Sequence, residues 1–533
     1  LPAELSRIKK EAKNRRKQQV LREKRYSSTP SVIAPAVATA VQQEVQSVDA
    51  DSPALVRDVP LLTVTRPISK LRMACVMDEF TYGSYAPECD LQQLTPDAWE
   101  AEITAFKPEL LFIESAWRGK DDKWGNKVGH NSHELQEIIA WCKERSIPTL
   151  FWNKEDPIHF ETFLTTAKQF DYVFTTDIDC IHRYKGALEH DRVFFLPFAC
   201  QPVNNNPIEK YDRKDAFCFA GAYYTRYPER TKDLESFVSE LPAYKPFDIY
   251  DRNFGKTDAN YQFPEMYRPY IVGALPFSEI DKAYKGYRYA INLNSIKQSQ
   301  TMFARRVYEL LASNTVTISN FSRGVRLIFG DLVATADSGE EILNRLKATD
   351  EKDPGMERLR LAALRKVMSE HTYADRFSYI ASKLSNIEIQ VELPLVVVVA
   401  VAQSEDELKK IASSYSRQTY ATKLLKVLIK GDWAVDPKAE GGSISYWYEK
   451  ECSKKSLVDV VGDGKFISLM TSADYYGPNY LTDMTLSKRY SQSDVVGKAS
   501  YFEFVNGEWT QHHPDQVYRP SSTYVFRAAL VAT

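Results

Sequence analysis

The sequence predicts an α/β protein with two Rossmann-like lobes, a basic helical N-terminal extension and a partial C-terminal α/β domain. Three observations predict this class. Short apolar strands alternate with amphipathic helices from about residue 70, the alternation starts afresh near residue 215, and a run of valines near residue 396 opens a third series. The length of 533 residues also suggests about three domains.

The chain divides into five expected segments. They are a basic helical segment (1–28), a linker or extended arm (29–70), an N-terminal Rossmann-like lobe (71–210), a C-terminal Rossmann-like lobe (211–388) and an incomplete α/β domain (389–533). The first segment is rich in Lys and Arg and has too few apolar positions for a coiled-coil seam. We weigh two interpretations of it: a solvated helix, or a contact with an anionic membrane face or an assembly partner.

The first lobe is predicted from five strands alternating with four helices. The strands are Met73–Val76, Glu109–Glu114, Pro148–Trp152, Tyr172–Thr175 and Val193–Leu196, and the helices are Pro96–Phe106, His133–Arg145, Phe160–Gln169 and Ile181–Ala187. Strands of this length that alternate with helices favour a parallel, doubly wound sheet. Polar residues that directly follow the strands then gather along one edge.

The second lobe repeats the pattern. Its predicted strands are Phe217–Phe219, Phe247–Tyr250, Tyr289–Leu293 and Thr315–Ile318, and its helices are Glu229–Ser239, Phe277–Tyr284, Phe303–Ala312, Ser338–Ala348 and Met356–Asn386. The third domain is predicted from strands at Pro394–Val401, Leu424–Leu428 and Phe466–Leu469, with helices at Glu405–Ser414 and Phe526–Val531. Since the chain stops as this last helix begins, we expect the natural protein to continue further.

Composition narrows the partners and the compartment. The net charge of −2 gives no electrostatic footprint for nucleic acid, so we expect no nucleic-acid partner. The seven cysteines are scattered and form no CxxC pair, which predicts reduced thiols rather than disulfides or a zinc site. No apolar run reaches the ~20 residues that span a bilayer. We therefore expect a cytoplasmic protein, with the inner membrane face as a peripheral contact.

The strongest candidate site lies in the second lobe, where a strand ends at Asn294 and a helix is predicted to start near Gln300–Thr301. Free N–H groups at a helix start suit a diphosphate. Arg305 and Arg306 add cationic charge that matches phosphate, and Glu309 could accept both hydroxyls of a ribose. The alternative is a surface helix with a Glu–Arg pair.

Two further stretches of this lobe belong to the same candidate site. Gly221 follows the first strand and permits a close backbone approach, with Arg226 and Arg230 near a diphosphate. The alternative for these arginines is a helix N-terminus with solvated side chains. Tyr250 follows the next strand, where a base could be held.

Polar residues after the strands of the first lobe form a second candidate site. They are Asp78, Glu79, Glu114, Trp117, Lys154, Glu155, Asp156 and His159. Among them we select His159, Asp78 and Glu155 as catalytic candidates, because each could act as a general base. Glu114, Trp117 and Asp156 are candidates for binding a substrate at the same site. The alternative for His159 is a structural histidine.

Residues 72–385 resemble the CgeB-type spore-protein and polysaccharide glycosyltransferases, which are GT-B enzymes related to glycosyltransferase family four. The order and spacing of several short motifs carry the resemblance. They are Met77-Asp-Glu-Phe80, Ile113-Glu-Ser-Ala-Trp117, Phe151-Trp-Asn-Lys-Glu-Asp-Pro157, Phe174-Thr-Thr-Asp177, Leu196-Pro-Phe-Ala199, Phe219-Ala-Gly221 and Arg306-Val-Tyr-Glu309.

The resemblance implies a nucleotide-diphosphate sugar as donor and a metal-independent reaction, in which arginines and helix ends neutralise the leaving diphosphate. It also implies that the first lobe takes the acceptor, with Glu114, Trp117 and Asp156 as the acceptor-binding residues. It implies that Glu309 holds the nucleotide ribose as the second Glu of a Glu-x7-Glu element. The first Glu of that element falls at Thr301, where this chain departs from the pattern. That departure puts the grip on the donor sugar in doubt, and with it a retaining outcome.

The C-terminal domain resembles part of a family-two, GT-A-type glycosyltransferase, from its valine-rich strand and from Ser472-Ala-Asp474 at the end of another strand. That family uses Asp-x-Asp to hold a divalent ion. Here Ser472 replaces the first Asp, so that Asp474 alone remains as a metal ligand. We expect a degenerate or truncated domain that acts as a scaffold or acceptor-binding module.

These inferences favour a glycosyltransferase of bacterial cell-envelope polysaccharide biosynthesis that acts on a surface polysaccharide, teichoic-acid-like or spore-coat acceptor. Two alternatives stay open. One is a nucleotide-sugar epimerase of the same two-lobed fold, which the attached third domain disfavours. The other is a non-catalytic carbohydrate-binding scaffold in a capsule assembly complex, which the departures at Thr301 and Ser472 favour.

Overall fold

The computed structural model describes most of the chain after the arm. The described ranges are 59–350, 355–391, 393–435, 442–452, 456–513, 518–519 and 528–532. They belong to one compact unit, Asp58–Thr533. The expected basic helix at 1–28 and most of the arm lie outside the described residues. Within these ranges, none of the helices is both long enough and apolar enough to cross a bilayer.

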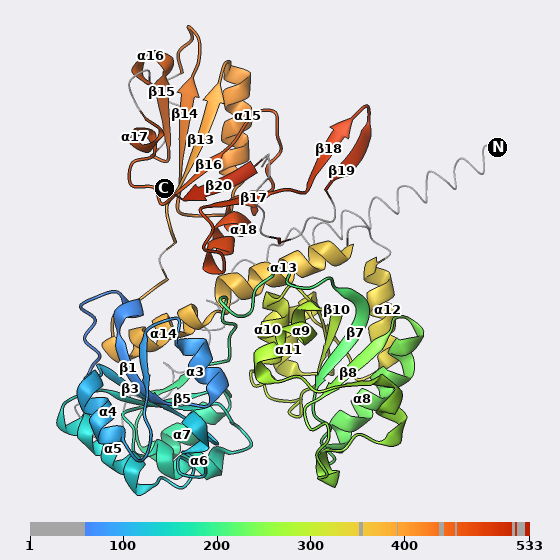
Figure 1. Cartoon of the computed structure of the whole chain (residues 1–533). Helices are drawn as coiled ribbons and strands as arrows, with labels where there is room; N and C mark the ends of the chain where they lie inside the picture. Colours follow the sequence, from blue (N-terminus) through green and yellow to red (C-terminus); the bar gives the residue numbers. More distant parts are fainter. Residues whose placement is uncertain are drawn as a thin grey trace. The chain divides into compact units, whose positions relative to one another are not determined.

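The first lobe is a six-stranded, wholly parallel sheet in the order β2-β1-β3-β4-β5-β6 (Figure 1). Its strands are β1 (Arg72–Val76), β2 (Asp90–Gln93), β3 (Leu110–Glu114), β4 (Thr149–Asn153), β5 (Tyr172–Thr175) and β6 (Val193–Phe195). Its helices are α3 (Glu79–Tyr85), α4 (Trp99–Phe106), α5 (His133–Glu144), α6 (Phe160–Ala167) and α7 (Cys180–Leu188). The predicted doubly wound lobe is thus confirmed. The prediction missed β2 and α3, and α3 is the helix that has the polar Asp78 and Glu79 at its start.

Both faces of this sheet are buried, which is why its central strands β3 and β4 are fully buried and apolar at most positions. Phe112 and Trp152 point to the face covered by α3, whereas Ile113 and Phe151 point to the face covered by α4, α5, α6 and α7. Successive side chains of a strand point to opposite faces, so a continuous apolar run is what two covered faces require.

The second lobe is another parallel six-stranded sheet, in the order β12-β11-β10-β7-β8-β9. Its strands are β7 (Lys214–Gly221), β8 (Phe247–Asp251), β9 (Ile271–Gly273), β10 (Tyr287–Asn292), β11 (Val316–Ser319) and β12 (Ala334–Thr335). Its helices are α8 (Pro228–Glu240), α9 (Asp281–Lys285), α10 (Arg306–Ala312), α11 (Arg323–Phe329), α12 (Gly339–Asp350) and α13 (Gly355–Glu370). Read from β9, this is the doubly wound order 3-2-1-4-5-6.

Two helix predictions in this lobe were wrong in their bounds. The helix expected to start near Gln300–Thr301 starts at Arg306, because side chains hold the preceding loop: Asn294 Oδ1 accepts a hydrogen bond from the Ala304 amide at 2.9 Å. The single helix expected at Met356–Asn386 is two, α13 and α14 (Tyr373–Ser385). A capping box between Thr372 and Asp375 starts the second helix and separates the two.

Helix α14 returns to the first lobe. Tyr373, Phe377 and Ile380 belong to the same apolar core as the β1 and β3 side chains of the first sheet. Arg376 donates to the carbonyl oxygens of Pro197 and Phe198 at 3.0 and 3.1 Å, which fixes the helix to the end of that lobe. The last helix of the two-lobed region therefore packs on the sheet that comes first in the sequence.

The third domain has a six-stranded sheet in the order β15-β14-β13-β16-β20-β17 and a separate hairpin. Its strands are β13 (Val396–Ala402), β14 (Lys423–Ile429), β15 (Ile444–Tyr448), β16 (Phe466–Leu469), β17 (Val495–Lys498), β18 (Tyr501–Val505), β19 (Glu508–His512) and β20 (Ala528–Ala532). Its helices are α15 (Glu405–Ser416), α16 (Glu449–Cys452), α17 (Leu457–Val461) and α18 (Tyr480–Leu486).

The prediction of a helix at Phe526–Val531 is wrong. The described part of this segment, from Ala528, is strand β20, which pairs antiparallel with both β16 and β17. An alanine- and valine-rich segment suits either state, and pairing on two sides decides for the strand.

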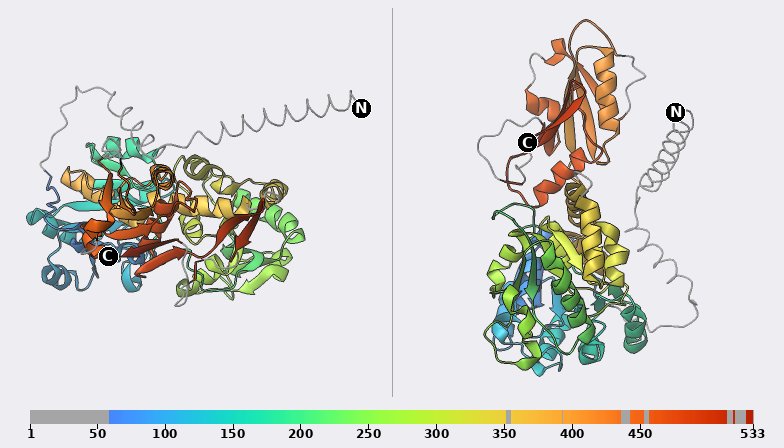
Figure 2. Two further views of the ribbon diagram at one scale, coloured as in Figure 1. Left: turned by 90° about the horizontal axis from the view of Figure 1, so that it is seen from above. Right: turned by 90° about the vertical axis from the view of Figure 1, so that its right-hand side faces the viewer.

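Polar contacts join the third domain to α13 and α14, the helices that close the two-lobed region; Figure 2 draws the ribbon of these parts in two further views. Arg365 of α13 makes a bidentate pair with Asp483 of α18, at 2.7 and 2.9 Å. Arg489 donates to the hydroxyl of Thr372 at 3.0 Å, at the cap of α14.

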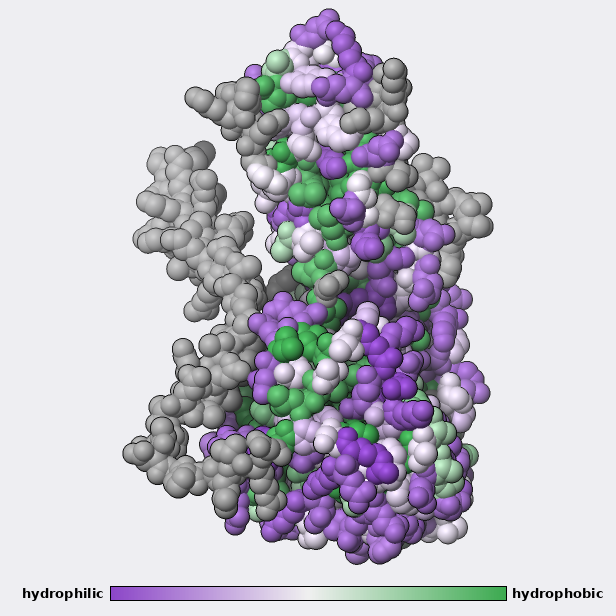
Figure 3. Space-filling model, turned by 90° about the vertical axis from the view of Figure 1, so that its left-hand side faces the viewer, coloured by the Kyte–Doolittle hydropathy of each residue, from purple (hydrophilic) through white to green (hydrophobic). Residues whose placement is uncertain are grey.

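On the face drawn in Figure 3, hydrophobic residues gather in the upper and middle part, whereas the lower part is largely hydrophilic.

Candidate functional site

A cleft of about 1350 Å³ lies at the carboxyl ends of both parallel sheets and is lined by both lobes. In each sheet the strand order reverses beside the first strand, between β1 and β3 in one lobe and between β7 and β10 in the other. Loops diverge at such a reversal and leave a crevice, which is where doubly wound sheets bind ligands. The topology thus places residues after β1, β3 and β7 at the cleft.

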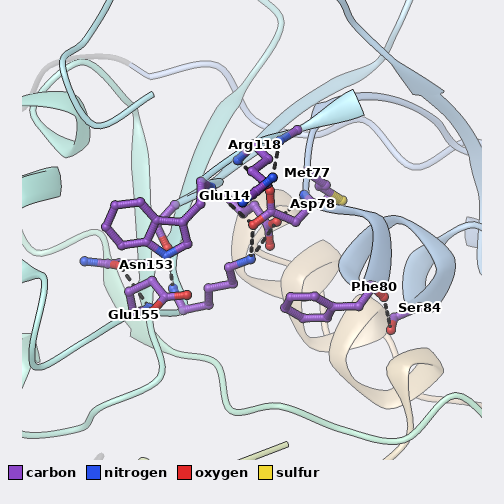
Figure 4. A network of polar contacts seen from close by, with 12 residues as sticks. Met77, Asp78, Phe80, Ser84, Glu114, Arg118, Asn153 and Glu155 are labelled. Atoms are coloured by element: carbon purple, nitrogen blue, oxygen red, sulfur yellow. Dashed lines mark hydrogen bonds and ion pairs between the residues drawn. The ribbon is translucent and has the colours of Figure 1, made fainter. Parts of the chain in front are cut away.

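Lys154, Asp78 and Glu114 form an ion-pair network on the first-lobe side of the cleft (Figure 4). Lys154, directly after β4, donates from Nζ to Asp78 Oδ2 at 2.6 Å and to Glu114 Oε1 at 3.0 Å. Glu114 ends β3 and is completely buried, and its Oε1 also accepts the amide of Asp78 at 2.5 Å. The ring of Phe80 lies 4.2 Å from Lys154 Nζ. Two carboxylates therefore share one buried ammonium.

The network sets the charge of its members. Burial alone would raise the pKa of Asp78, but Lys154 and the amides of Gly119 and Arg118 outweigh it, so this pKa lies below its usual value. Burial would lower the pKa of Lys154, and the carboxylates of Glu114 and Asp78 raise it above the usual value instead. Burial raises the pKa of Glu114 despite Lys154. Asp78 and Lys154 are thus a carboxylate and an ammonium at neutral pH.

Asp78 also fixes the loop that follows β3. Its carboxylate accepts the backbone amides of Trp117, Arg118 and Gly119 at 3.2, 3.0 and 2.9 Å. Trp117 lies on this loop, lines the cleft and is 38% exposed. Its ring meets those of His159 and Phe163 edge to face, with centroids 4.8 and 5.4 Å away.

The other first-lobe candidates are divided between the cleft and the interior. Glu155 lines the cleft and is half-buried, and Glu79 lies exposed at its edge. His159 caps α6 behind Trp117 and does not line the cleft. Asp156 is fully buried and accepts hydrogen bonds from Thr175 Oγ1 and Asn153 Nδ2, at 2.6 and 2.8 Å. Burial raises its pKa to about 7, and this carboxyl lies inside the lobe rather than at the cleft.

The second-lobe wall carries the predicted cation and carboxylate cluster. Arg305, Arg306 and Glu309 all line the cleft. The Glu309 carboxylate pairs with Arg305 and accepts a hydrogen bond from the hydroxyl group of Tyr284 at 2.9 Å. The Arg305 guanidinium also lies over the ring of Phe80, 4.4 Å from its centre, so that one side chain joins the two walls.

Arg306 differs from its neighbour. Its Nε is buried and has no hydrogen-bond partner among the described residues, although the side chain faces the cleft. An unpaired buried donor costs free energy that a ligand oxygen recovers. Arg306 is therefore available to an anion, whereas Arg305 is paired with Glu309.

The remaining second-lobe candidates separate in the same way. Gly221 and Tyr250 line the cleft. A Cβ at Gly221 would meet the ring of Phe219 at 2.7 Å, which explains the glycine there. Arg230 is buried and donates to the carbonyl of Ala222, while Arg226 is exposed beside tyrosine rings. Neither of these two arginines lines the cleft.

Two candidates act on the loop before α10 instead of lining the cleft. Asn294 is buried and holds the loop through the Ala304 amide. Thr301 joins the lobes: its hydroxyl donates to the carbonyl of Thr176 at 3.1 Å and accepts the amide of Ile178 at 3.0 Å. At the position where the sequence resemblance implies a Glu, this chain thus has an interlobe contact.

Sequence reasoning missed one charged run and two aromatic side chains at the cleft. The run Arg118–Asp122 lines the first-lobe wall, and its charged residues directly after a buried strand were the available signal. Tyr284 was placed only in a helix, and no local pattern connects it with Glu309, 25 positions further on. The ring of Phe80, placed between Lys154 and Arg305, gave no signal beyond its motif.

Asp474 of the third domain lies in the loop after β16, where its carboxylate accepts the hydroxyl of Thr471 at 3.2 Å. Across the described part of the chain, no three His, Cys, Asp or Glu side chains come together as a metal site.

Comparison with known proteins agrees with this geometry in the second lobe. Residues 230–382 match a family model described as "Glycosyl transferase-like". The matched region contains Arg305, Arg306 and Glu309. A search of curated proteins gives no significant match.

Solved structures give distant likenesses. A T4 phage BGT in complex with UDP and Mn2+ is 13% identical with a TM-score of 0.37, over 59% of this chain and 99% of that one. An alpha-glucosyltransferase bound to UDP and a 13-mer DNA is 11% identical with a TM-score of 0.41, over 59% and 99%. An alpha1,3-fucosyltransferase with GDP-fucose is 11% identical with a TM-score of 0.33, over 64% and 95%. Because these TM-scores are low, the assignment of the fold depends on the strand order of the two sheets. The resemblance to a glycosyl transferase-like domain is limited to residues 230–382.

Proposed function

We propose that this chain is a glycosyltransferase that takes its sugar from a nucleotide-diphosphate sugar. The second lobe binds the donor and the first lobe binds the acceptor. The observation that carries the proposal is the cleft itself, where Arg305, Arg306 and Glu309 face the polar wall around Asp78 and Glu155. The glycosyl transferase-like match over residues 230–382 supports the same reaction class.

Arginines are suited to the leaving group. When the glycosidic bond to the diphosphate breaks, negative charge grows on the phosphate oxygens, and fixed guanidinium groups stabilise it. Arg306 has a buried donor free to meet that charge, while Arg305 is engaged by Glu309. The diphosphate attracts Arg305 away from Glu309, and the freed carboxylate accepts the ribose hydroxyls. Tyr284 keeps that carboxylate in place.

The acceptor hydroxyl must lose a proton as it attacks the sugar. Asp78 is a weak base for this step, because its oxygens accept three amides and an ammonium and its pKa is lowered. Glu155 lines the same wall and is the better-placed general base. His159, behind Trp117, acts as support for that ring. Of the three catalytic candidates, we therefore assign the proton to Glu155.

Other parts of the proposal rest on the resemblance of the sequence. They are a metal-independent reaction in the two-lobed region, a CgeB-type relationship, a cytoplasmic location and a role in making a cell-envelope glycan. The third domain is proposed as a degenerate GT-A-like scaffold, since Ser472 and Asp474 offer a single carboxylate where two ligands are needed.

Calorimetry with UDP, GDP and ADP tests the donor site. We expect one of them to bind, and Glu309→Gln to weaken it about 10- to 100-fold, because hydrogen bonds to a charged group contribute about 1.5–3 kcal/mol. Glu265→Gln is the matched control, since Glu265 also pairs with an arginine but is 82% exposed and lies outside the cleft. If no nucleotide binds, or if Glu309→Gln binds like the parent, the donor site is wrong.

The reaction class is tested with the matching nucleotide sugar. A glycosyltransferase releases free nucleotide and transfers or hydrolyses the sugar. An epimerase returns an isomerised sugar, and a binding scaffold leaves the compound unchanged. Chromatography of the products separates the three outcomes.

A further inference from the structure

The two walls of the cleft carry opposite charge. The first-lobe wall has five carboxylates and three cations, which gives a net charge of −2. The carboxylates are Asp78, Glu79, Asp121, Asp122 and Glu155, and the cations are Arg118, Lys120 and Lys154. The second-lobe wall has three cations, Arg252, Arg305 and Arg306, and one carboxylate, Glu309, which gives a net charge of +2. The net charges of the two walls are equal in size and opposite in sign.

Much of the negative charge is not neutralised locally. Glu79, Asp121 and Glu155 form no ion pair with another described residue, whereas Asp78 is held by Lys154. Asp122 pairs with Arg118 at 3.4 Å, and both side chains are largely exposed. Charged walls around a narrow, partly desolvated space focus their field and select ligands by charge.

A fixed aromatic surface lies within the same wall. Trp117 is 38% exposed and packs edge to face against two rings, and Asp78 holds its loop through three backbone amides. A rigid aromatic side chain offers contact area at a low cost in conformational entropy. Carboxylate oxygens beside it accept hydrogen bonds from hydroxyl groups. An apolar ring face edged by hydroxyls is the chemistry of a sugar ring.

We propose that the acceptor is an uncharged or amino-bearing glycan whose ring stacks on Trp117 and whose hydroxyls meet Glu79, Asp121 and Glu155. Phosphorylated and sulfated glycans are excluded by the negative wall. This inference rests on the proposed function, and it narrows the acceptors considered from sequence, because a teichoic-acid-like polymer carries a phosphate in every repeat. It also assigns the loop 117–122 as the element that selects the acceptor.

The test uses the full chain, a saturating nucleotide and an immobilised glycan array with uncharged, amino, phosphorylated and sulfated members. We expect retention on uncharged or amino glycans. Trp117→Ala should lower this retention at least about tenfold, as expected for a central aromatic contact, and Trp117→Phe should restore most of it. The triple variant Glu79→Gln, Asp121→Asn, Glu155→Gln should raise retention on anionic glycans about fivefold or more.

Three results would overturn the inference: retention mainly on anionic glycans, retention on no uncharged or amino glycan, or unchanged retention in Trp117→Ala. Circular dichroism and nucleotide calorimetry on each variant show whether it is folded. If a nucleotide binds but the array fails, the acceptor class is wrong and the donor site stands. If uncharged glycans bind but no nucleotide does, the acceptor class stands and the transferase proposal falls.

Discussion

Replacing Lys154 by Met tests how the first-lobe wall is held together. Met has a similar length and no charge, so the change removes the ammonium that Asp78 and Glu114 share. At distances of 2.6 and 3.0 Å, each attraction amounts to about 5–6 kcal/mol at an effective dielectric constant of about 20. The cost of desolvating the three charges offsets most of this attraction in the intact network. The substitution leaves Glu114 buried without its cation, and this loss of pairing costs about 3–5 kcal/mol.

Thermal unfolding followed by circular dichroism measures this loss. For a lobe of about 150–250 residues, each kcal/mol shifts the transition by about 2–4 °C, so we expect a decrease of about 6–20 °C. The matched control is Lys123→Met, which removes a 2.8 Å ion pair with Asp97 whose side chains are 42% and 62% exposed. Exposed pairs contribute about 0–1 kcal/mol, so the control should shift by a few degrees at most.

Lys154 is buried and shared by two carboxylates, whereas Lys123 is exposed and paired with one, so equal shifts for Lys154→Met and Lys123→Met would refute the reasoning. The double variant Lys154→Met, Glu114→Gln adds a second check. It removes the stranded carboxylate together with its cation, and it should recover part of the lost stability. If the double variant is less stable than Lys154→Met alone, the network is not held together by the charge pairing described here.

Three further predictions follow from other contacts. Burial raises the pKa of Asp156 from 3.8 to about 7. Between about pH 4 and pH 7 the folded protein therefore keeps this proton while the unfolded chain releases it. The free energy of unfolding should fall over this range, compared with that of Asp156→Asn. The loss is at most about 4 kcal/mol, and a difference between the two unfolding transitions that does not change with pH would contradict it. Tyr284→Phe removes a hydrogen bond to Glu309 and should weaken nucleotide binding about 3- to 10-fold in calorimetry, with less discrimination between ribose and 2′-deoxyribose nucleotides; unchanged discrimination would argue against ribose binding by Glu309. Arg365→Met breaks the bidentate pair with Asp483 and should speed proteolysis between the third domain and the lobes, whereas an unchanged cleavage pattern would mean that the pair does not hold the domain.

The fold was largely predictable because apolar runs and turn residues are local signals. Every strand predicted for the two lobes is present, since a run such as Leu110–Glu114 is buried at every position and apolar at all but the last. Elements of weak pattern were missed: β2 is polar at most positions, and α3 is only seven residues long. The wrong helix at Phe526–Val531 shows the limit of local reasoning, because a strand with partners on both sides overrides the propensity of its residues.

The candidate site was predictable in its location but not in its contacts. Polar residues after parallel strands meet at one edge, so Asp78, Trp117 and Glu155 could be placed at the cleft from their positions alone. The same rule placed Asp156 there, but hydrogen bonds to Thr175 and Asn153 turn its side chain into the lobe. The direction of a side chain depends on its partners, which come from distant parts of the chain.

By itself, the sequence determined the alternation of strands and helices, the repetition of that alternation in two lobes and the place of the polar strand ends. These are properties of short segments, so periodicity and turn chemistry specify them. Only the tertiary structure decided which charges meet. Lys154 lies 76 positions from Asp78 and 40 from Glu114, and Thr301 reaches Thr176 across 125 positions. The Lys154 pairs are set by the order of β1, β3 and β4 within one sheet, and the Thr301 contact is set by how the two lobes meet, so no local pattern specifies them.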